Sequence, residues 1–82
     1  MNASDVEASV IAALQDIAPE VDGSELVADQ SLRSQVDLDS MDWLNFLVRL
    51  HSTFGVDIPE SDYAELVTLA NIIDYVSTRV SS

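Results

Sequence analysis

The segment V-D-L-D-S-M-D-W-L-N-F-L-V-R-L-H-S-T-F-G, residues 36–55, carries the strongest helical pattern of the chain. Its apolar side chains recur at steps of four, three and four positions, which places them on one face of an α-helix: Trp43, Leu47, Leu50 and Phe54. Asp39 or Ser40 is suited to begin this helix, and Gly55 is a typical helix terminator. The segment therefore predicts one amphipathic helix of about four turns.

Two further helices are predicted on either side of this segment. Ser4 and Glu7 have the spacing of a capping box, and Pro19 ends a helix over residues 4–18. Thr68 is suited to cap a last helix. The apolar faces of the two helices consist of Val6, Val10, Ile11, Leu14 and Ile17, and of Leu69, Ile72, Ile73, Val76 and Val80.

Residues 19–39 show no sustained periodicity and are expected to form a long loop with one helical turn near residues 24–28. Its apolar side chains should attach it to the core, namely Val21, Leu26, Leu32, Val36 and Leu38. A short helix is expected over residues 61–66. The prediction is an all-α, small four-helix bundle with three main helices, one short helix and a long loop between helices one and two, forming a single domain over residues 1–82.

The chain is strongly acidic: 15 Asp and Glu face 3 arginines, which gives a net charge of −12 over 82 residues. Such a surface disfavours nucleic acid and anionic lipid and favours basic protein partners. Without cysteine, disulfides, zinc–thiolate sites and cysteine nucleophiles are excluded. No apolar run approaches the roughly 18 residues of a membrane span, and no basic leader begins the chain, so we expect a cytoplasmic monomer.

Catalytic and metal-binding interpretations fit the residues poorly. Ser40 and His51 are the obvious nucleophile and base, but about 16 Å of helix axis separates them. His51 is expected to be a solvated helix residue. Asp37 and Asp39 could begin a calcium-binding loop, yet Met41, Asp42 and Val48 stand where that loop needs a ligand, a glycine and a glutamate. The sequence therefore predicts neither an enzyme nor a dedicated metal site. Loose binding of a divalent cation by Asp37, Asp39 and Asp42 remains open.

The run Asp39-Ser40-Met41-Asp42 has two interpretations. It can be a simple N-terminal cap, in which Asp39 or Ser40 accepts backbone N–H groups and Asp42 lies at the positive end of the helix dipole. Alternatively, Ser40 can hold a phosphate, because a helix N-terminus stabilises an anion. The neighbouring acids would then serve to attract a positively charged enzyme to the serine.

The pattern around this serine resembles the acyl carrier protein family. The similar stretches are S-L at 31–32, V-D-L-D-S-M-D at 36–42, F-G-V-D-I-P at 54–59 and I-I-D-Y-V at 72–76. The resemblance implies a carrier that is not itself an enzyme. Ser40 would receive 4′-phosphopantetheine from coenzyme A through a separate, Mg²⁺-dependent phosphopantetheinyl transferase, and the thiol of this arm would hold acyl groups as thioesters.

The resemblance also assigns roles to neighbouring residues. Asp39 is similar to the family's acid beside the transferase metal, and the inward-facing stripe would line a pocket for a short or medium acyl chain. Acyl-transferring or acyl-activating enzymes are the implied partners. They would contact the apolar residues Met41, Leu44 and Val48, with the acids Asp37, Asp39 and Asp42 steering them near the arm.

The chain departs from the family pattern at two places. Asp37 stands where a glycine is usual, and Asn45, Arg49 and His51 occupy outward positions where fatty-acid-synthesis carriers place acids. These differences favour a specialised free-standing carrier over a housekeeping one, within fatty acid, polyketide or another acyl-transfer pathway. An aminoacyl or peptidyl carrier and an unmodified acidic interaction protein remain as alternatives.

Overall fold

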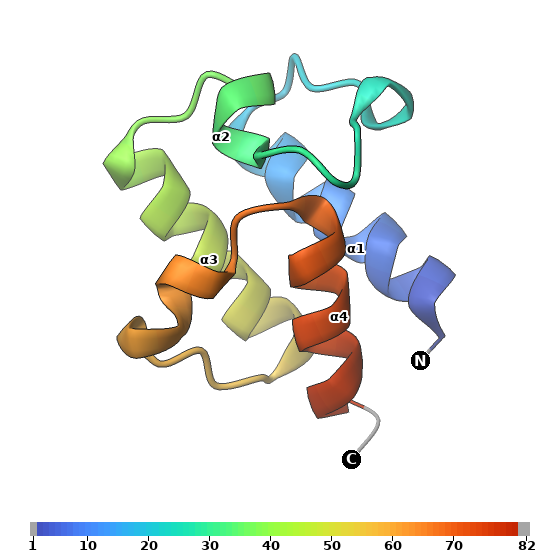
Figure 1. Cartoon of the computed structure of the whole chain (residues 1–82), viewed down its shortest axis with the longest axis vertical. Helices are drawn as coiled ribbons and strands as arrows, with labels where there is room; N and C mark the ends of the chain where they lie inside the picture. Colours follow the sequence, from blue (N-terminus) through green and yellow to red (C-terminus); the bar gives the residue numbers. More distant parts are fainter. Residues whose placement is uncertain (1, 81–82) are drawn as a thin grey trace.

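Three long helices form the bundle in this computed structural model, which describes residues 2–80. They are α1 (Ala3–Ile17), α3 (Ser40–Phe54) and α4 (Leu69–Val80), as Figure 1 shows. A one-turn helix, α2 (Leu32–Gln35), and two 3₁₀ turns, η1 (Gly23–Glu25) and η2 (Glu60–Glu65), lie in the connections. The all-α prediction is confirmed for the described residues, and none of their helices is long and apolar enough to span a membrane.

The start of α1 differs from the predicted capping box. Asn2 is the N-cap, and its side-chain Oδ1 accepts a hydrogen bond from the Asp5 N–H at 2.9 Å. Ser4 lies inside the first turn, so the prediction that Ser4 caps this helix was wrong. The helix ends at Ile17, one residue short of the expected boundary, because Pro19 restricts the backbone of Ala18.

The ends of α3 and α4 follow the sequence pattern. Gly55 adopts a left-handed conformation (φ 66°) after α3, and its N–H donates to the carbonyl of His51. At the start of α4, Thr68 Oγ1 accepts from the Asn71 N–H at 3.0 Å, while Asn71 Oδ1 accepts from the Thr68 N–H. Thr68 is therefore the cap that the sequence predicted, with an asparagine as its reciprocal partner.

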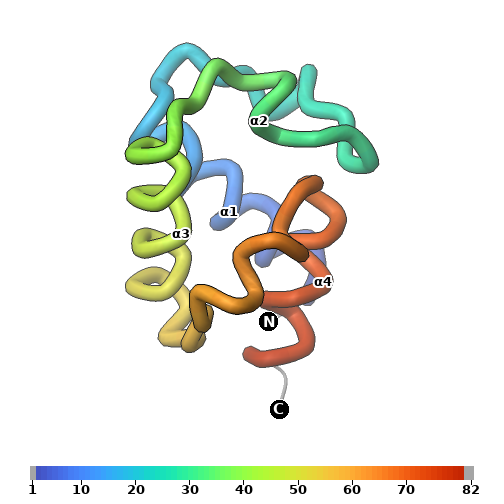
Figure 2. The backbone as a smooth tube through the Cα atoms, turned by 60° about the vertical axis from the view of Figure 1, so that its left-hand side comes forward, coloured from blue at the N-terminus to red at the C-terminus, as the bar shows by residue number. Residues whose placement is uncertain are grey.

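The core lies where α1 packs against both α3 and α4. Figures 1 and 2 show η2 crossing between α3 and α4, on the side away from α1. Each apolar side chain that is fully buried here contributes about 1.5–3 kcal/mol to folding. The largest of them are Val6, Val10, Leu14, Leu32, Phe46, Leu47, Leu50, Ile72 and Val76.

The long connection between α1 and α3 is ordered by burial and by backbone pairing. All five predicted anchoring side chains lie in the core or pack against it. The Leu32 N–H donates to the Val67 carbonyl at 3.0 Å, and the Ala70 N–H donates to the Ala28 carbonyl at 2.9 Å. This pairing places α2 over one end of the bundle (Figure 2). The sequence pattern missed α2, because four residues are too short to show a helical period.

The two shorter turns lie close to their expected places. The turn expected near residues 24–28 is η1, and Asp22 caps it by accepting from the N–H and the hydroxyl of Ser24. The short helix expected over residues 61–66 is the 3₁₀ turn η2. At Gly23 the loop passes so close to α1 that an added Cβ would lie 2.8 Å from Cγ2 of Ile11. Only glycine fits this approach without a shift.

Candidate functional site

Ser40 is the first residue of α3, and its side chain is exposed. The N-cap of this helix is Asp39, whose Oδ1 accepts from the Asp42 N–H at 2.8 Å. The sequence left the cap open between Asp39 and Ser40, and the structure assigns it to Asp39. Among residues 2–80, no side chain or backbone group bonds the Ser40 hydroxyl, which is therefore free for chemistry.

The backbone around this hydroxyl suits a phosphate ester. The Trp43 N–H makes the first helical bond, to the Asp39 carbonyl at 2.9 Å, and the Asp42 N–H is taken by the Asp39 carboxylate. Within the described part of the chain, the N–H groups of Ser40 and Met41 have no acceptor. These two donors and the dipole of a 15-residue helix would stabilise a phosphodiester on Ser40. The residues present therefore fit the phosphate end of the arm.

The predicted apolar contact residues form a line along the outside of α3. Met41 is 67% exposed, Leu44 42% and Val48 53%, although each is large and apolar. Their spacing of three and four positions places them on one helix face that begins beside Ser40. Asp37 and Asp39 are exposed before the helix, and Asp42 is half-buried within its first turn. The structure thus brings the apolar line and these acids together around one serine.

The carboxylates near Ser40 do not form a metal site. Within residues 2–80, no three His, Cys, Asp or Glu side chains come together in a way that could hold a metal ion. Loose binding of a cation by Asp37, Asp39 and Asp42, which the sequence left open, therefore has no preformed cluster behind it.

Two of the outward residues on α3 have partners that the sequence did not reveal. The guanidinium of Arg49 lies 3.3 Å from the Asp16 carboxylate at the end of α1. His51 Nδ1 bonds the Val56 carbonyl at 2.8 Å and lies 3.8 Å from the Asp57 carboxylate. His51 is exposed, as expected, but it also fixes the turn after α3. A hydrolytic pairing with Ser40 is excluded because both residues lie on one helix, 11 positions apart.

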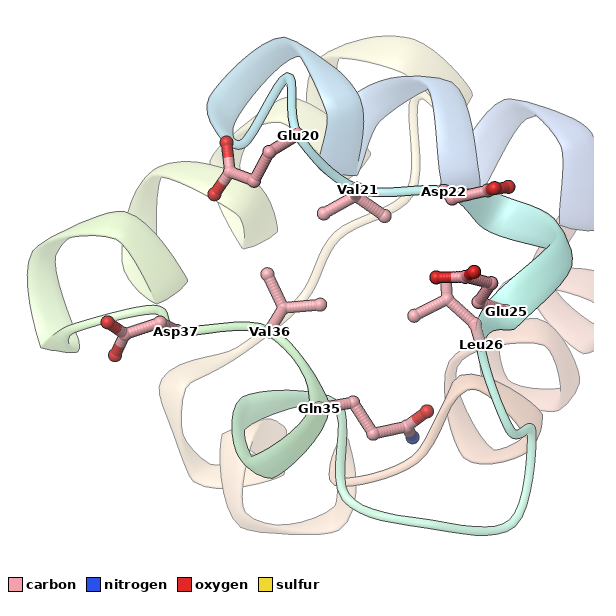
Figure 3. Close-up of a pocket in the computed structure, with 8 residues that line it drawn as sticks. All are labelled: Glu20, Val21, Asp22, Glu25, Leu26, Gln35, Val36 and Asp37. Atoms are coloured by element: carbon pink, nitrogen blue, oxygen red, sulfur yellow. The ribbon is translucent and has the colours of Figure 1, made fainter.

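A separate cleft opens between the end of α1 and the segment that leads into α3 (Figure 3). Val21, Leu26 and Val36 point into it, and Gln35 closes one side. Its rim carries the carboxylates of Glu20, Asp22, Glu25 and Asp37. The hydrogen bonds that Asp22 accepts from Ser24 lower the pKa of its carboxyl. Ser40 does not line this cleft, so it is separate from the candidate attachment site.

The inward stripe of α3 offers no preformed channel from Ser40. Phe46, Leu47 and Leu50 are fully buried in the packing of the described residues. Two openings beside α3 lie next to Tyr63 of η2, and a third lies on the other side, between Asp16 of α1 and Arg49. Of these three side chains only Leu47 lines an opening, the cleft beside Ile58 and Tyr63, so the structure shows no enclosed acyl-chain pocket along this stripe among the described residues.

Comparison with known proteins agrees with this geometry. Residues 8–76 match the family described as "Phosphopantetheine attachment site". The chain is 34% identical over 70 residues to an acyl carrier protein of Rhodococcus erythropolis, which covers 82% of this chain and 77% of the relative. A meromycolate extension acyl carrier protein of Mycolicibacterium aurum is also 34% identical over 70 residues, covering 82% and 72%.

A third relative aligns along its whole length. It is an acyl carrier protein of Thermosynechococcus vestitus, 28% identical over all 82 residues of both chains. The family match spans α3, with its free serine hydroxyl, and most of the helices that support it. Together these findings show that the chain belongs to the phosphopantetheine-attachment family of acyl carrier proteins, which bear 4′-phosphopantetheine covalently and are carriers rather than catalysts.

Proposed function

We propose that Ser40 carries the 4′-phosphopantetheine arm and that residues 1–82 act as one carrier domain. One observation carries the proposal: Asp39 caps α3, so the exposed hydroxyl of Ser40 is left free at the helix start. A serine that served as the cap would lose its structural bond on modification. Here the arm can be added without breaking any hydrogen bond that holds the helix.

Attachment requires a separate phosphopantetheinyl transferase. Ser40 Oγ bonds to the phosphorus of the phosphopantetheine group, the pyrophosphate bond of coenzyme A breaks, and adenosine 3′,5′-bisphosphate leaves. The serine proton passes to a base of the transferase. Asp39, which is exposed next to Ser40, lies where it can meet the transferase's Mg²⁺. Since the chain has no cysteine, the arm supplies the only thiol for thioester formation.

Partner enzymes dock on the outside of α3 in this proposal. The exposed side chains of Met41, Leu44 and Val48 gain free energy when an apolar surface covers them. Asp37 and Asp42 lie at the end of this line next to Ser40, where they attract basic residues of the partner. The apolar contacts then hold the complex, and the acids direct it toward the arm.

The cargo we propose is an acyl group of a specialised acyl-transfer pathway. No acid lies on the chain between Asp42 and Asp57, and Arg49 and Asn45 occupy the outer side of α3. A partner built for a row of acids along this helix finds none beyond its first turn. The relatives are named as acyl carriers, which favours acyl groups over the aminoacyl or peptidyl alternative.

Mass spectrometry tests the attachment site. Incubation with coenzyme A and a broad-specificity transferase should add one phosphopantetheine to the unaltered chain and none to Ser40→Ala. The matched control is Ser52→Ala, which removes another exposed serine of the same helix and should be modified in full. Modification at Ser31 or Ser34, or none at all, would contradict the proposal. Loading of the arm by an amino-acid-adenylating ligase, and not by acyltransferases, would favour the aminoacyl alternative.

A further inference from the structure

Trp43 is the first buried residue of α3 after Ser40. It follows Ser40 by three residues, a spacing that puts the two Cβ atoms about 5–6 Å apart on adjacent turns of α3. Its side chain points inward and is only 9% exposed. The indole ring packs against Phe46, with ring centroids 5.3 Å apart, and Phe46 is fully buried. Two large aromatic rings thus fill the interior behind the first turns of α3.

The openings around this aromatic pair are shallow clefts at the surface. Trp43 forms one wall of the first, together with Tyr63, Leu66 and Val67. The second lies further along α3, between Val48 and the segment Ile58-Pro59, and Tyr63 lines it too. Leu66 is buried beneath the first cleft, and Leu47 is buried beneath the second.

We infer that Trp43 closes the bundle interior to the cargo, so the acyl group stays in solvent at the end of the arm. This inference rests on the proposed function of Ser40. Admitting an acyl chain would require the indole to leave a close-packed site or the core to be overpacked, and both are unfavourable. A long apolar chain would therefore remain outside the core and largely exposed to water. The geometry suits short or polar acyl groups, whose exposure costs little.

Chain-length dependence provides the test, because Trp43 is the only tryptophan of the chain and reports on its own surroundings. Ser40 is loaded enzymatically with acetyl-, butyryl- or octanoyl-pantetheine, and the mass of each product is measured first. For the unaltered protein we expect the same tryptophan emission maximum and the same Tm with all three groups. A blue-shifted emission or a Tm that rises with chain length would overturn the inference. Absence of the added mass would overturn the proposed function, and this inference with it.

Two variants test whether Trp43 is the residue that closes the bundle interior. Trp43→Ala opens space beneath the arm, and the octanoyl form should then melt several degrees above the acetyl form, because the chain fills the hole. Trp43→Leu serves the same purpose with a smaller loss of packing, should the alanine variant fold poorly. Leu50→Ala is the matched control: it opens a buried hole on the same helix, about 10 Å further along the axis than Trp43, and should show no chain-length effect. Equal responses of the Trp43 and Leu50 variants would overturn the inference.

Discussion

The side-chain amide of Gln35 bonds both backbone groups of Val27. Its Oε1 accepts from the Val27 N–H at 2.7 Å, and its Nε2 donates to the Val27 carbonyl at 2.8 Å. The same Nε2 also donates to the Gln30 carbonyl at 3.1 Å. The Gln35 amide therefore pairs with the backbone of the segment before α2 in the way that a neighbouring β-strand would. This contact shapes the chain that leads into α3 and Ser40.

Gln35→Glu should destabilise the fold although the side chain keeps its size. The new carboxylate can still accept from the Val27 N–H, but it faces the carbonyls of Val27 and Gln30 without a donor. We expect the free energy of unfolding to fall by about 1–2 kcal/mol in urea denaturation. Gln15→Glu adds the same charge and removes one weaker bond, to the Val21 carbonyl, so it should cost less. Equal losses in the two variants would contradict the role assigned to Gln35.

Asp39 and Ser40 should differ sharply in their effect on stability. Asp39→Ala removes the N-cap of α3 and should lower the free energy of unfolding by about 1 kcal/mol. Ser40→Ala should change it by at most a few tenths of a kcal/mol, because the hydroxyl holds no structural bond and alanine favours helix. Asp39→Asn keeps the capping oxygen and serves as the control for charge. Thermal melts of the three variants test this difference. A larger loss of stability for Ser40→Ala than for Asp39→Ala would show that Ser40 is the cap.

Tyr75 should make stability depend on pH in the alkaline range. Partial burial and the hydrogen bond that its hydroxyl donates to Asp62 at 2.6 Å raise the pKa of Tyr75 to about 12. An unfolded tyrosine has a pKa of about 10. The stabilisation is therefore complete below pH 10 and is lost as the pH rises from 10 toward 12. Urea midpoints measured between pH 9 and 12 should fall across this window.

A pair of variants isolates this effect. Tyr75→Phe removes the titrating hydroxyl and should flatten the decline above pH 10, while lowering stability at pH 7 by about 1 kcal/mol. Tyr63→Phe changes the other tyrosine of the chain, and its stability should still fall above pH 10 as in the unaltered protein. If the stability of Tyr75→Phe falls as steeply above pH 10 as that of the unaltered protein, the hydrogen bond between Tyr75 and Asp62 does not govern the alkaline loss of stability.

The outer side of α3 should control the choice of partner. We expect slow loading by a malonyl transferase of fatty acid synthesis, and faster loading of the double variant Asn45→Glu, Arg49→Ala. Each charge pair at the rim of an interface contributes about 0.2–1 kcal/mol, so the two changes together should raise affinity by roughly 2- to 30-fold. His51 is left unchanged because its ring bonds the Val56 carbonyl.

The control for this experiment adds a charge elsewhere. Ala12→Glu places a carboxylate at an exposed position of α1 and should leave loading unchanged. The measurement is the initial rate of malonyl transfer to the pantetheine-bearing protein. A specialised partner choice is contradicted if the unaltered protein is loaded as fast as a housekeeping carrier and the double variant is no faster.

Features that depend on nearby residues could be predicted from the sequence. The apolar faces of the three long helices, the terminating Gly55 and the capping Thr68 all follow from spacings within a few positions. The start of α1 was predicted wrongly because Asn2 and Ser4 are both good caps, and local pattern alone does not rank them. The one-turn α2 depends on contacts with Val67 and the loop, which no local pattern encodes.

The candidate site also has features that could be predicted from nearby residues and features that depend on distant contacts. The position of Ser40 at the start of the helix follows from local pattern, whereas the roles of Met41, Leu44 and Val48 and of the nearby acids are implied only by the resemblance to the family. The partners of Arg49 and His51 could not be foreseen, because Asp16 belongs to another helix and the Val56 carbonyl becomes available only through the turn at Gly55. Trp43 was predicted to face inward, but its contact with Phe46 requires the actual packing of the core.

The hydrogen bonds between the segments 28–32 and 67–70 also bear on the order of folding. They join backbone groups that are separated in the chain by all of α3 and η2. Such non-local bonds form only after a large loop has closed, whereas each long helix can form quickly on its own. We expect α1 and α3 to associate first and this end of the bundle to assemble last. Local opening there would expose the amides of Leu32 and Ala70 to exchange with solvent while the contact of α1 with α3 remains intact.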